Sequence, residues 1–342
     1  MPRVSIIVPN YNHAQFLDLR LQSILDQTFD DFELIFLDDA STDGSLQVFN
    51  EYRSDGRVRS ILNDENSGSP FIQWNRGIDE ACGEYIWIAE SDDYCERDFL
   101  ARLVAAMDKH PEAGLAYSQS WIVSQDDEKL KVLDWYHVFG GGAHWATDFA
   151  SEGKQELKQY MAIQNTIPNA SAVLIRRSVL EGDLRAPEHM KLCGDWLFWT
   201  RILLKSDLAF IATPLNCFRQ AHANSQRSAS AKAGLEALES LEIQQEILRF
   251  VQPERVFVRR MFNHHLKRWA SLAFHDQLPR SFDFEVADGF RRVYELGRIS
   301  ALSMRIQFWT YFHFVLPAMR SFLYRSTVGR FRLYYRRKMG AA

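Results

Sequence analysis

The sequence predicts an α/β fold with a mostly parallel sheet flanked by helices, because strand-like and helical patterns alternate over about the first 120 residues. Residues 4–8, 32–37, 58–62 and 85–89 are short runs rich in β-branched and aromatic side chains. Such nearly continuous apolar strands are typical of a parallel sheet covered on both faces. Ligands of these sheets bind beyond the carboxyl ends of the strands.

Amphipathic helices are expected between the strands. Apolar residues recur at three- and four-residue spacing after the first, second and fourth strands. Two further strands, at 172–175 and near 209–211, enclose a short aromatic helix. Helical patterns dominate from Ser228 onward, with helices expected over 231–250, 255–274 and 284–296. We therefore expect a catalytic domain over residues 1–228 and a smaller α-helical region over residues 229–342.

Composition and charge exclude several classes of protein. The chain has 342 residues, 46% of them hydrophobic and 25% charged, which indicates a globular protein rather than a disordered or collagen-like one. The four cysteines are widely spaced without a CxxC pair, and the amino-terminal run lacks the apolar segment of a signal peptide. We expect a reducing, cytoplasmic setting.

The carboxyl-terminal tail has a different character. Residues 301–342 contain eight basic residues, ten aromatic residues and no Asp or Glu. Basic and aromatic side chains together favour peripheral contact with an anionic membrane surface, here the inner face of the cytoplasmic membrane. Packing of a helix on its own domain is the main alternative, and we expect no nucleic-acid partner. The longest uncharged stretch, residues 306–319, is shorter than the ~20 residues that a spanning helix needs.

Polar residues gather where the predicted strands end. Pro9-Asn10-Tyr11-Asn12 follows the first strand, Asp38-Asp39-Ala40-Ser41-Thr42-Asp43-Gly44 the second, and Glu90-Ser91-Asp92-Asp93 the fourth. No GxGxxG or GK[ST] loop accompanies them, which argues against a dinucleotide enzyme or a P-loop ATPase. Carboxylates that converge repel each other unless a cation balances them, and Mg²⁺ or Mn²⁺ shared with substrate phosphates would do so. The alternatives are helix capping by the second segment and a solvated turn for the third.

In their order and spacing these motifs resemble the family 2 glycosyltransferases, which are inverting enzymes with the GT-A fold that use nucleotide-sugar donors. The resemblance covers about residues 3–226 and includes Asn75-Arg76-Gly77 and Gly83-Glu84-Tyr85-Ile86. It implies transfer of a sugar to an acceptor hydroxyl in bacterial surface polysaccharide or glycolipid assembly. The donor would be UDP-linked, because the family typically binds uracil. The acceptor would be a saccharide or a lipid-linked molecule.

The resemblance also implies roles for the donor-binding residues. Pro9, Tyr11 and Asn12 would line the nucleotide pocket, and Asp39 would accept a hydrogen bond from the base, typically uracil N3–H. Asn75 would support the donor pocket.

The DxD-like segment would bind the diphosphate. Asp92 and Asp93 would hold the ribose and a diphosphate-bound Mn²⁺ or Mg²⁺. The sequence departs from the family pattern at Glu90, where Asp is frequent, and at Trp74, where Arg is common.

The second half of the domain would supply the chemistry. Cys193-Gly194-Asp195-Trp196 resembles the family's acidic motif at the start of a helix, so Asp195 is the candidate base, with an N-cap as the alternative. Arg219 would contact the leaving diphosphate, and His222 would contact the diphosphate or its metal. Asn169 and Ser171 are expected to contact the acceptor. A nucleotidyltransferase and a non-catalytic binding or scaffold protein remain the competing functions.

Overall fold

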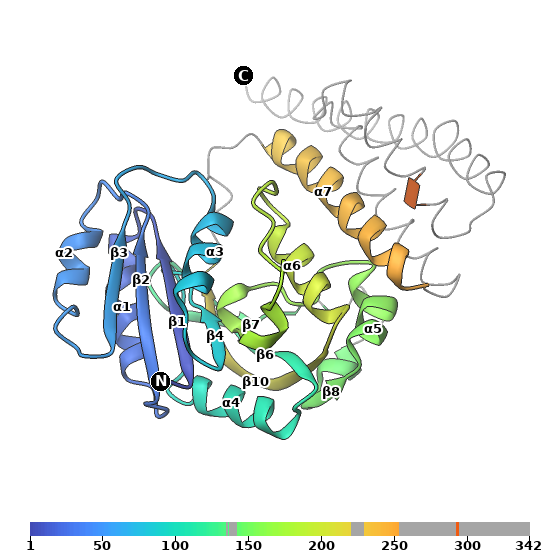
Figure 1. The fold of residues 1–342 in the computed structure, drawn as a ribbon, viewed down its shortest axis with the longest axis horizontal. Coiled ribbons are helices and arrows are strands. Elements are labelled where there is room, and N and C mark those ends of the chain that lie inside the picture. The colour runs from blue at the N-terminus through green and yellow to red at the C-terminus, as the bar shows by residue number, and fades with distance from the viewer. Residues whose placement is uncertain (135, 137–141, 220–228, 253–291, 294–342) are drawn as a thin grey trace, which may run out of the picture. The chain divides into compact units, whose positions relative to one another are not determined.

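A computed structural model describes residues 1–134, 136, 142–219, 229–252 and 292–293 of the chain (Figure 1). The chain divides into two compact units, Met1–Gln226 and Arg227–Ala342. The first unit is a mixed α/β structure with a central sheet flanked by helices, which confirms the predicted fold class. The assignment of residues 1–228 to a catalytic domain stays a prediction. So does the assignment of residues 229–342 to a helical region with a basic tail.

The first unit is organised around one sheet. Its main strands are, in spatial order, β3 (Val58–Leu62), β2 (Phe32–Asp38), β1 (Val4–Asn10), β4 (Tyr85–Ile88), β9 (Val173–Arg176), β6 (Ala113–Val123), β10 (Asp207–Arg219) and β5 (Tyr94–Cys95). β7 (Lys129–Val132) pairs with β6, and β8 (Phe149–Ser151) pairs with β10. The first four strands are parallel, as predicted.

β9 has a direction that the sequence did not indicate. It runs antiparallel to both of its neighbours, β4 and β6. Residues that precede β9 therefore lie at the same edge of the sheet as residues that follow β4. This edge carries the polar motifs.

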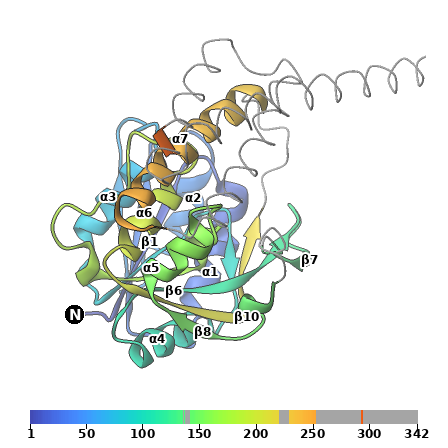
Figure 2. The same cartoon turned by 90° about the vertical axis from the view of Figure 1, so that its right-hand side faces the viewer.

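Helices cover both faces of the sheet, as Figures 1 and 2 show. They are α1 (Ala14–Leu25), α2 (Ser45–Asn50), α3 (Pro70–Glu80), α4 (Phe99–Lys109), α5 (Gly153–Glu156) and α6 (Gly194–Leu203). Short 3₁₀ turns occupy Gly142–Trp145, Ala170–Ala172 and Arg177–Leu180, and a π-helical turn occupies Leu157–Met161. The expected aromatic helix between the two later strands is α6.

Successive side chains of β1 point to opposite faces of the sheet, and each face is covered by different helices. Ile6 and Val8 belong to the apolar core that also contains residues of α1 and α4. Ile7 points to the opposite face, where α3 packs. A Cβ at Gly77 of α3 would lie 2.4 Å from Ile7 Cγ2, so the missing side chain lets α3 approach the sheet closely.

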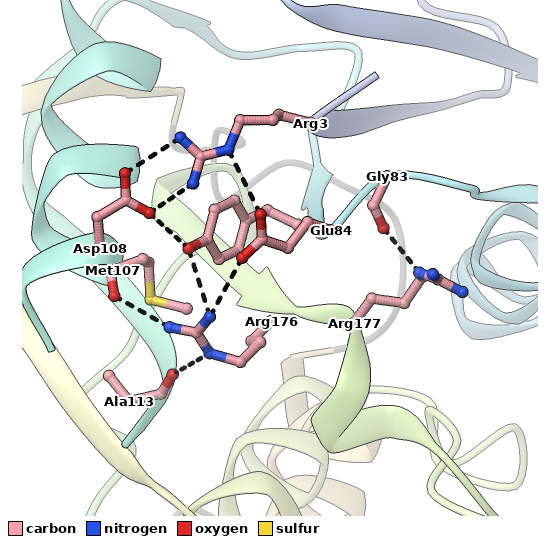
Figure 3. Close-up of polar contacts among 9 residues, drawn as sticks. Arg3, Gly83, Glu84, Met107, Asp108, Ala113, Arg176 and Arg177 are labelled. Carbon is pink, nitrogen blue, oxygen red and sulfur yellow. Dashed lines mark hydrogen bonds and ion pairs between the residues drawn. The ribbon is translucent and has the colours of Figure 1, made fainter. Parts of the chain in front are cut away.

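A polar network closes the edge of the sheet opposite the polar motifs (Figure 3). Arg3 donates two hydrogen bonds to the Asp108 carboxylate, at 2.6 and 3.1 Å, and these bonds hold the pKa of Asp108 below its usual range. Arg176 of β9 donates to the carbonyl oxygens of Met107 and Ala113 at 2.9 and 3.0 Å. The network ties β1, β9 and α4 together.

The described part of the second unit is mainly α7 (Ala229–Phe250), which matches the expected helix at 231–250. The helices expected at 255–274 and 284–296, and the tail at 301–342, lie outside the described residues. Within the described ranges, no helix combines the length and hydrophobicity that a membrane crossing requires.

Candidate functional site

The loops after β1 and β2 are joined to each other by side-chain hydrogen bonds. The Asn10 amide donates to Asp38 Oδ1 at 2.8 Å, and Asn12 Oδ1 accepts from the Thr42 backbone N–H at 2.8 Å. Ser41 Oγ accepts from the Asn12 backbone N–H at 3.0 Å and donates to Asp38 Oδ1 at 2.7 Å. The Asp38 carboxylate therefore accepts hydrogen bonds from both loops and holds them together.

Both loops turn sharply at the strand ends. Asn12 and Ala40 have φ angles of +56° and +60°, a left-handed conformation that costs about 1–2 kcal/mol for a residue with a side chain. The turn after β1 leaves Tyr11 46% exposed beside the sheet edge, while Pro9 is buried at the end of β1. Of the three residues predicted to line the nucleotide pocket, Tyr11 and Asn12 are thus the exposed ones.

Asp39 is held in one orientation by neutral donors. It is 4% exposed and accepts hydrogen bonds from Asn63 Nδ2 at 2.6 Å, Ser67 Oγ at 2.8 Å and Gln73 Nε2 at 2.8 Å. The Ser67 backbone N–H also donates to it, at 2.9 Å. A bond from a nucleotide base, which the resemblance implies, would join or replace one of these donors, and it stays a prediction.

The acidic loop, residues 90–93, follows β4. Asp93 is 3% exposed and accepts from the Arg219 backbone N–H at 2.8 Å and from Asn169 Nδ2 at 3.0 Å. Burial, with the neighbouring charge of Asp92, raises the pKa of Asp93 to about 6. Asp92 is partly exposed beside it. The negative charge of the adjacent Asp92 and Asp93 side chains is therefore not fully balanced by nearby positive charge.

These two residues fit a divalent cation that takes most of its ligands from a substrate. Among the described residues no group of three His, Cys, Asp or Glu side chains could hold a metal by itself. Mg²⁺ in nucleotide sites is bound through one or two carboxylates together with phosphate oxygens, which matches the Asp92–Asp93 pair. His222, the third predicted ligand, lies outside the described residues.

Arg219 supports the acidic loop from the end of β10. Its Nε donates to the Asp92 carbonyl at 2.8 Å, and its terminal nitrogens bind the Ser124 carbonyl and the Asp127 carboxylate. The guanidinium also lies 4.3 Å from the ring centre of Phe16. The structure thus gives Arg219 a role in holding the loop, and its predicted contact with the leaving diphosphate stays a prediction.

Asn169 and Ser171 reach the acidic loop because β9 is antiparallel to β4. Asn169 Oδ1 accepts from the Ser171 backbone N–H at 2.6 Å, and Ser171 Oγ accepts from the Glu90 backbone N–H at 3.1 Å. Both residues are buried and bind the loop in this structure. Their contact with an acceptor stays a prediction.

The two positions that depart from the family pattern are hydrogen-bonded to each other. Trp74 Nε1 donates to Glu90 Oε1 at 2.8 Å. Burial of the Glu90 carboxyl group, with the charge of Asp92 adding to it, raises its pKa to about 8. Sequence spacing gave no signal for this pair, because the two residues come from different elements.

The candidate base lies in the first turn of α6. Asp195 is partly buried, and its Oδ2 accepts from Asn165 Nδ2 at 3.1 Å. The preceding Gly194 packs on the ring of Phe71, where a Cβ would lie 2.5 Å from two ring carbons. The glycine in the predicted motif therefore lets α6 approach α3.

Helix α3 links all the acidic segments. Gln73 binds Asp39 and Trp74 binds Glu90. Phe71, from the same turn, packs on the start of α6 immediately before the candidate base. Contacts of α3 thus connect the loop after β2, the acidic loop and the start of α6, while the convergence of Asp39, Asp92 and Asp195 on one cation site stays a prediction.

Asn75, also on α3, has a different local role. Its amide donates to the Ala186 carbonyl at 3.0 Å and to Glu188 Oε1 at 2.8 Å, and its oxygen accepts from the Ala186 backbone N–H at 2.9 Å. The residue holds the segment that leads into α6. Its predicted support of the donor pocket stays a prediction.

Two residues that contact the acidic loop were not predicted from the sequence. His13 Nδ1 lies 2.9 Å from Ser91 Oγ, and the fully buried Arg20 donates from Nε to the Glu90 carbonyl at 2.8 Å. Arg20 adds a positive charge that partly counteracts the rise in the pKa of Asp93. Its position within an apolar helical stripe gave no sign of this contact.

Comparison with known proteins adds independent information. The family model described as Glycosyl transferase family 2 matches residues 5–182. The putative teichuronic acid biosynthesis glycosyltransferase TuaG of Bacillus subtilis is 26% identical over 210 residues, which are 61% of this chain and 75% of TuaG. Poly(ribitol-phosphate) beta-N-acetylglucosaminyltransferase TarS of Staphylococcus aureus is 34% identical over 112 residues, 32% of this chain and only 20% of TarS.

Solved structures share the fold. The structure of S. aureus TarS in complex with UDP-GlcNAc has a TM-score of 0.60 at 19% identity, with 87% of this chain and 90% of that chain covered. The mannosyltransferase PcManGT from Pyrobaculum calidifontis, in complex with GDP-Man and Mn²⁺, has a TM-score of 0.51 at 18% identity, with 96% and 86% covered.

Proposed function

Because this chain belongs to glycosyl transferase family 2, we propose that it is an inverting enzyme that moves a sugar from a UDP-linked donor to an acceptor hydroxyl. The observation that carries the proposal is the gathering of Asp39, Glu90 and the Asp195 helix around α3, at the edge where the parallel strands end. Ligands of such sheets bind at that edge.

The donor would lie across the loops after β1 and β2. The exposed ring of Tyr11 offers an apolar face for a base, and the Asp39 carboxylate offers an acceptor for a base N–H. UDP is supported by the name of the TarS complex, and PcManGT shows that the same fold also serves a GDP-sugar.

Asp92 and Asp93 would hold Mn²⁺ or Mg²⁺ together with the diphosphate. When bound, the cation would offset the negative charge that grows on the departing diphosphate. Asn169 and the Arg219 backbone N–H hold the Asp93 carboxylate in place for this contact. The Mn²⁺ in the PcManGT complex supports the choice of a divalent ion.

Asp195 would act as the general base. Its carboxylate would take the proton of the acceptor hydroxyl while that oxygen forms a bond to the anomeric carbon. The bond from the anomeric carbon to the diphosphate oxygen breaks in the same step, and its electron pair leaves with the diphosphate. Asn165 orients the carboxylate from one side.

The acceptor would be a surface polysaccharide or a lipid-linked saccharide. This class is supported by the names of two relatives, the putative teichuronic acid biosynthesis glycosyltransferase TuaG and the poly(ribitol-phosphate) beta-N-acetylglucosaminyltransferase TarS. We further propose that residues 301–342, which lie outside the described residues, contact an anionic membrane through their basic and aromatic side chains. Equal sedimentation of the full chain and a chain lacking 301–342 with anionic liposomes would contradict that contact.

The test of the function uses the full chain and a panel of UDP- and GDP-sugars. Thermal shifts with and without Mn²⁺ identify the donor, and release of the nucleoside diphosphate in the presence of Mn²⁺ then measures turnover. We expect a stabilising UDP-sugar and metal-dependent release of UDP. Binding of a nucleotide sugar without any hydrolysis or transfer would instead favour a non-catalytic binding protein.

A further inference from the structure

Trp74 occupies an unusual position between two functional elements. It is 3% exposed, and its indole N–H donates to Glu90 Oε1 at 2.8 Å. The other side of the ring faces α6, with ring centres of Phe198 and Trp199 at 6.3 and 6.2 Å. One side chain of α3 thus contacts both the acidic loop and the helix that begins with the candidate base.

The length of the Glu90 side chain is what makes the hydrogen bond. An Asp at this position would end one carbon earlier, about 1.5 Å short. The 2.8 Å contact would then open beyond the roughly 3.2 Å limit of an N–H···O bond. The Glu at position 90 and the Trp at position 74 therefore form a matched pair.

Simple core packing does not explain the direction of the indole N–H. Trp199 is a useful contrast, because its ring packs in the same aromatic group but its Nε1 has no hydrogen-bond partner among the described residues. Trp74 instead directs its single donor to a carboxylate from another element. Because hydrogen bonds prefer a defined distance and angle, this bond constrains the orientation of the Glu90 carboxyl group as well as its distance.

We propose that Trp74 is a positioning residue that holds the acidic loop in register with the α6 helix through its bond to Glu90. The inference rests on the proposed function, since it assigns the metal–diphosphate contact to the loop and the base to α6. Loss of the bond would let the donor and the base move relative to each other. Turnover would then fall more than donor binding.

The test is a double-mutant cycle of Trp74→Phe and Glu90→Asp in the full chain, with Trp199→Phe as matched control. Trp74→Phe keeps a ring but removes the donor, and Glu90→Asp keeps a carboxyl group but shortens the side chain. Trp199→Phe removes a similar volume from the same aromatic group without breaking a hydrogen bond. Glu90→Asp leaves the packing between α3 and α6 intact, so it tests the bond even if Trp74→Phe does not fold.

We expect each of the two site variants to lower kcat by about tenfold or more, the cost of leaving one buried polar group without its hydrogen-bond partner, while the donor KM changes less than about threefold. The double variant should be no slower than the worse single variant, because both remove the same bond. Trp199→Phe should change kcat by less than about threefold. An active wild-type protein in which Trp74→Phe matches Trp199→Phe, or in which the two single effects multiply, would overturn the positioning role alone. A wild-type protein without turnover on any nucleotide sugar would overturn the proposed function and this role together.

Discussion

Replacing Gly194 by Ala should displace the first turn of α6 and lower both stability and turnover. A Cβ at position 194 would lie 2.5 Å from two carbons of the Phe71 ring and 2.9 Å from a third. Phe71 cannot swing away freely, because it is buried and packed edge-on against Trp74 with ring centres 5.1 Å apart. The helix must therefore move, and Asp195 moves with it.

The size of the effect follows from two opposing contributions. Inserting a methyl group into a packed core costs about 1–3 kcal/mol, and three close contacts to a rigid ring place this site in the upper half of that range. Replacing glycine by alanine in a helix returns up to about 1 kcal/mol. We expect a net loss of about 1–2 kcal/mol in the free energy of unfolding.

Gly56→Ala is the matched control. No atom lies within 4 Å of a Cβ built at Gly56, and its φ is not in the left-handed range. This variant should be unchanged or more stable by up to about 1 kcal/mol, with normal kcat. Urea unfolding and steady-state kinetics of both variants measure the difference. A Gly194→Ala protein with wild-type stability and wild-type kcat would show that α6 is not fixed by this contact.

Four further outcomes are expected. Asp195→Asn should lower kcat by at least about 100-fold while calorimetric binding of Mn²⁺ and UDP stays normal, and unchanged turnover would reject the base assignment. Because the pKa of Asp93 is raised to about 6, protons should compete with Mn²⁺, so calorimetry should show weaker ion binding at pH 5 than at pH 7; equal affinities would contradict this. Since this pKa is higher than the ordinary 3.8, protonation of Asp93 favours the folded state, and its contribution to metal-free stability should rise as the pH falls from 7 towards 4. Arg176→Met should cost about 2–4 kcal/mol in urea unfolding, through the lost bonds to two carbonyl groups, yet leave the donor KM unchanged because the residue lies at the opposite edge of the sheet.

Local patterns were enough to predict the framework. Strand-length apolar runs predicted the parallel half of the sheet, and the acidic residues after these runs indicated the edge that carries the candidate site. The Gly194-Asp195 motif correctly indicated the start of α6. These features depend on residues that are close together in the sequence, so local sequence patterns are enough to predict them.

The partners of the acidic side chains were not predictable in the same way. Asp39 binds Gln73 across 34 positions, and Asp93 binds Asn169 across 76. The second contact needs β9 to run antiparallel to β4, and an apolar run of four residues carries no sign of strand direction. Long-range topology therefore decides which side chains meet, while the sequence indicates only which are available.

The donors that surround the carboxyl groups have one property in common: most of them are neutral. Two amides, a hydroxyl and a backbone N–H hold Asp39, an amide and a backbone N–H hold Asp93, and an indole holds Glu90. Neutral donors fix the direction of a carboxylate without cancelling its charge. Burial, and after it the charge of Asp92, raises the pKa of Asp93 and Glu90, and the remaining negative charge of the loop would repel a diphosphate that arrived alone. Under the proposed function, a divalent cation bound with the diphosphate would offset this repulsion. We therefore expect the donor and the cation to bind the acidic loop together.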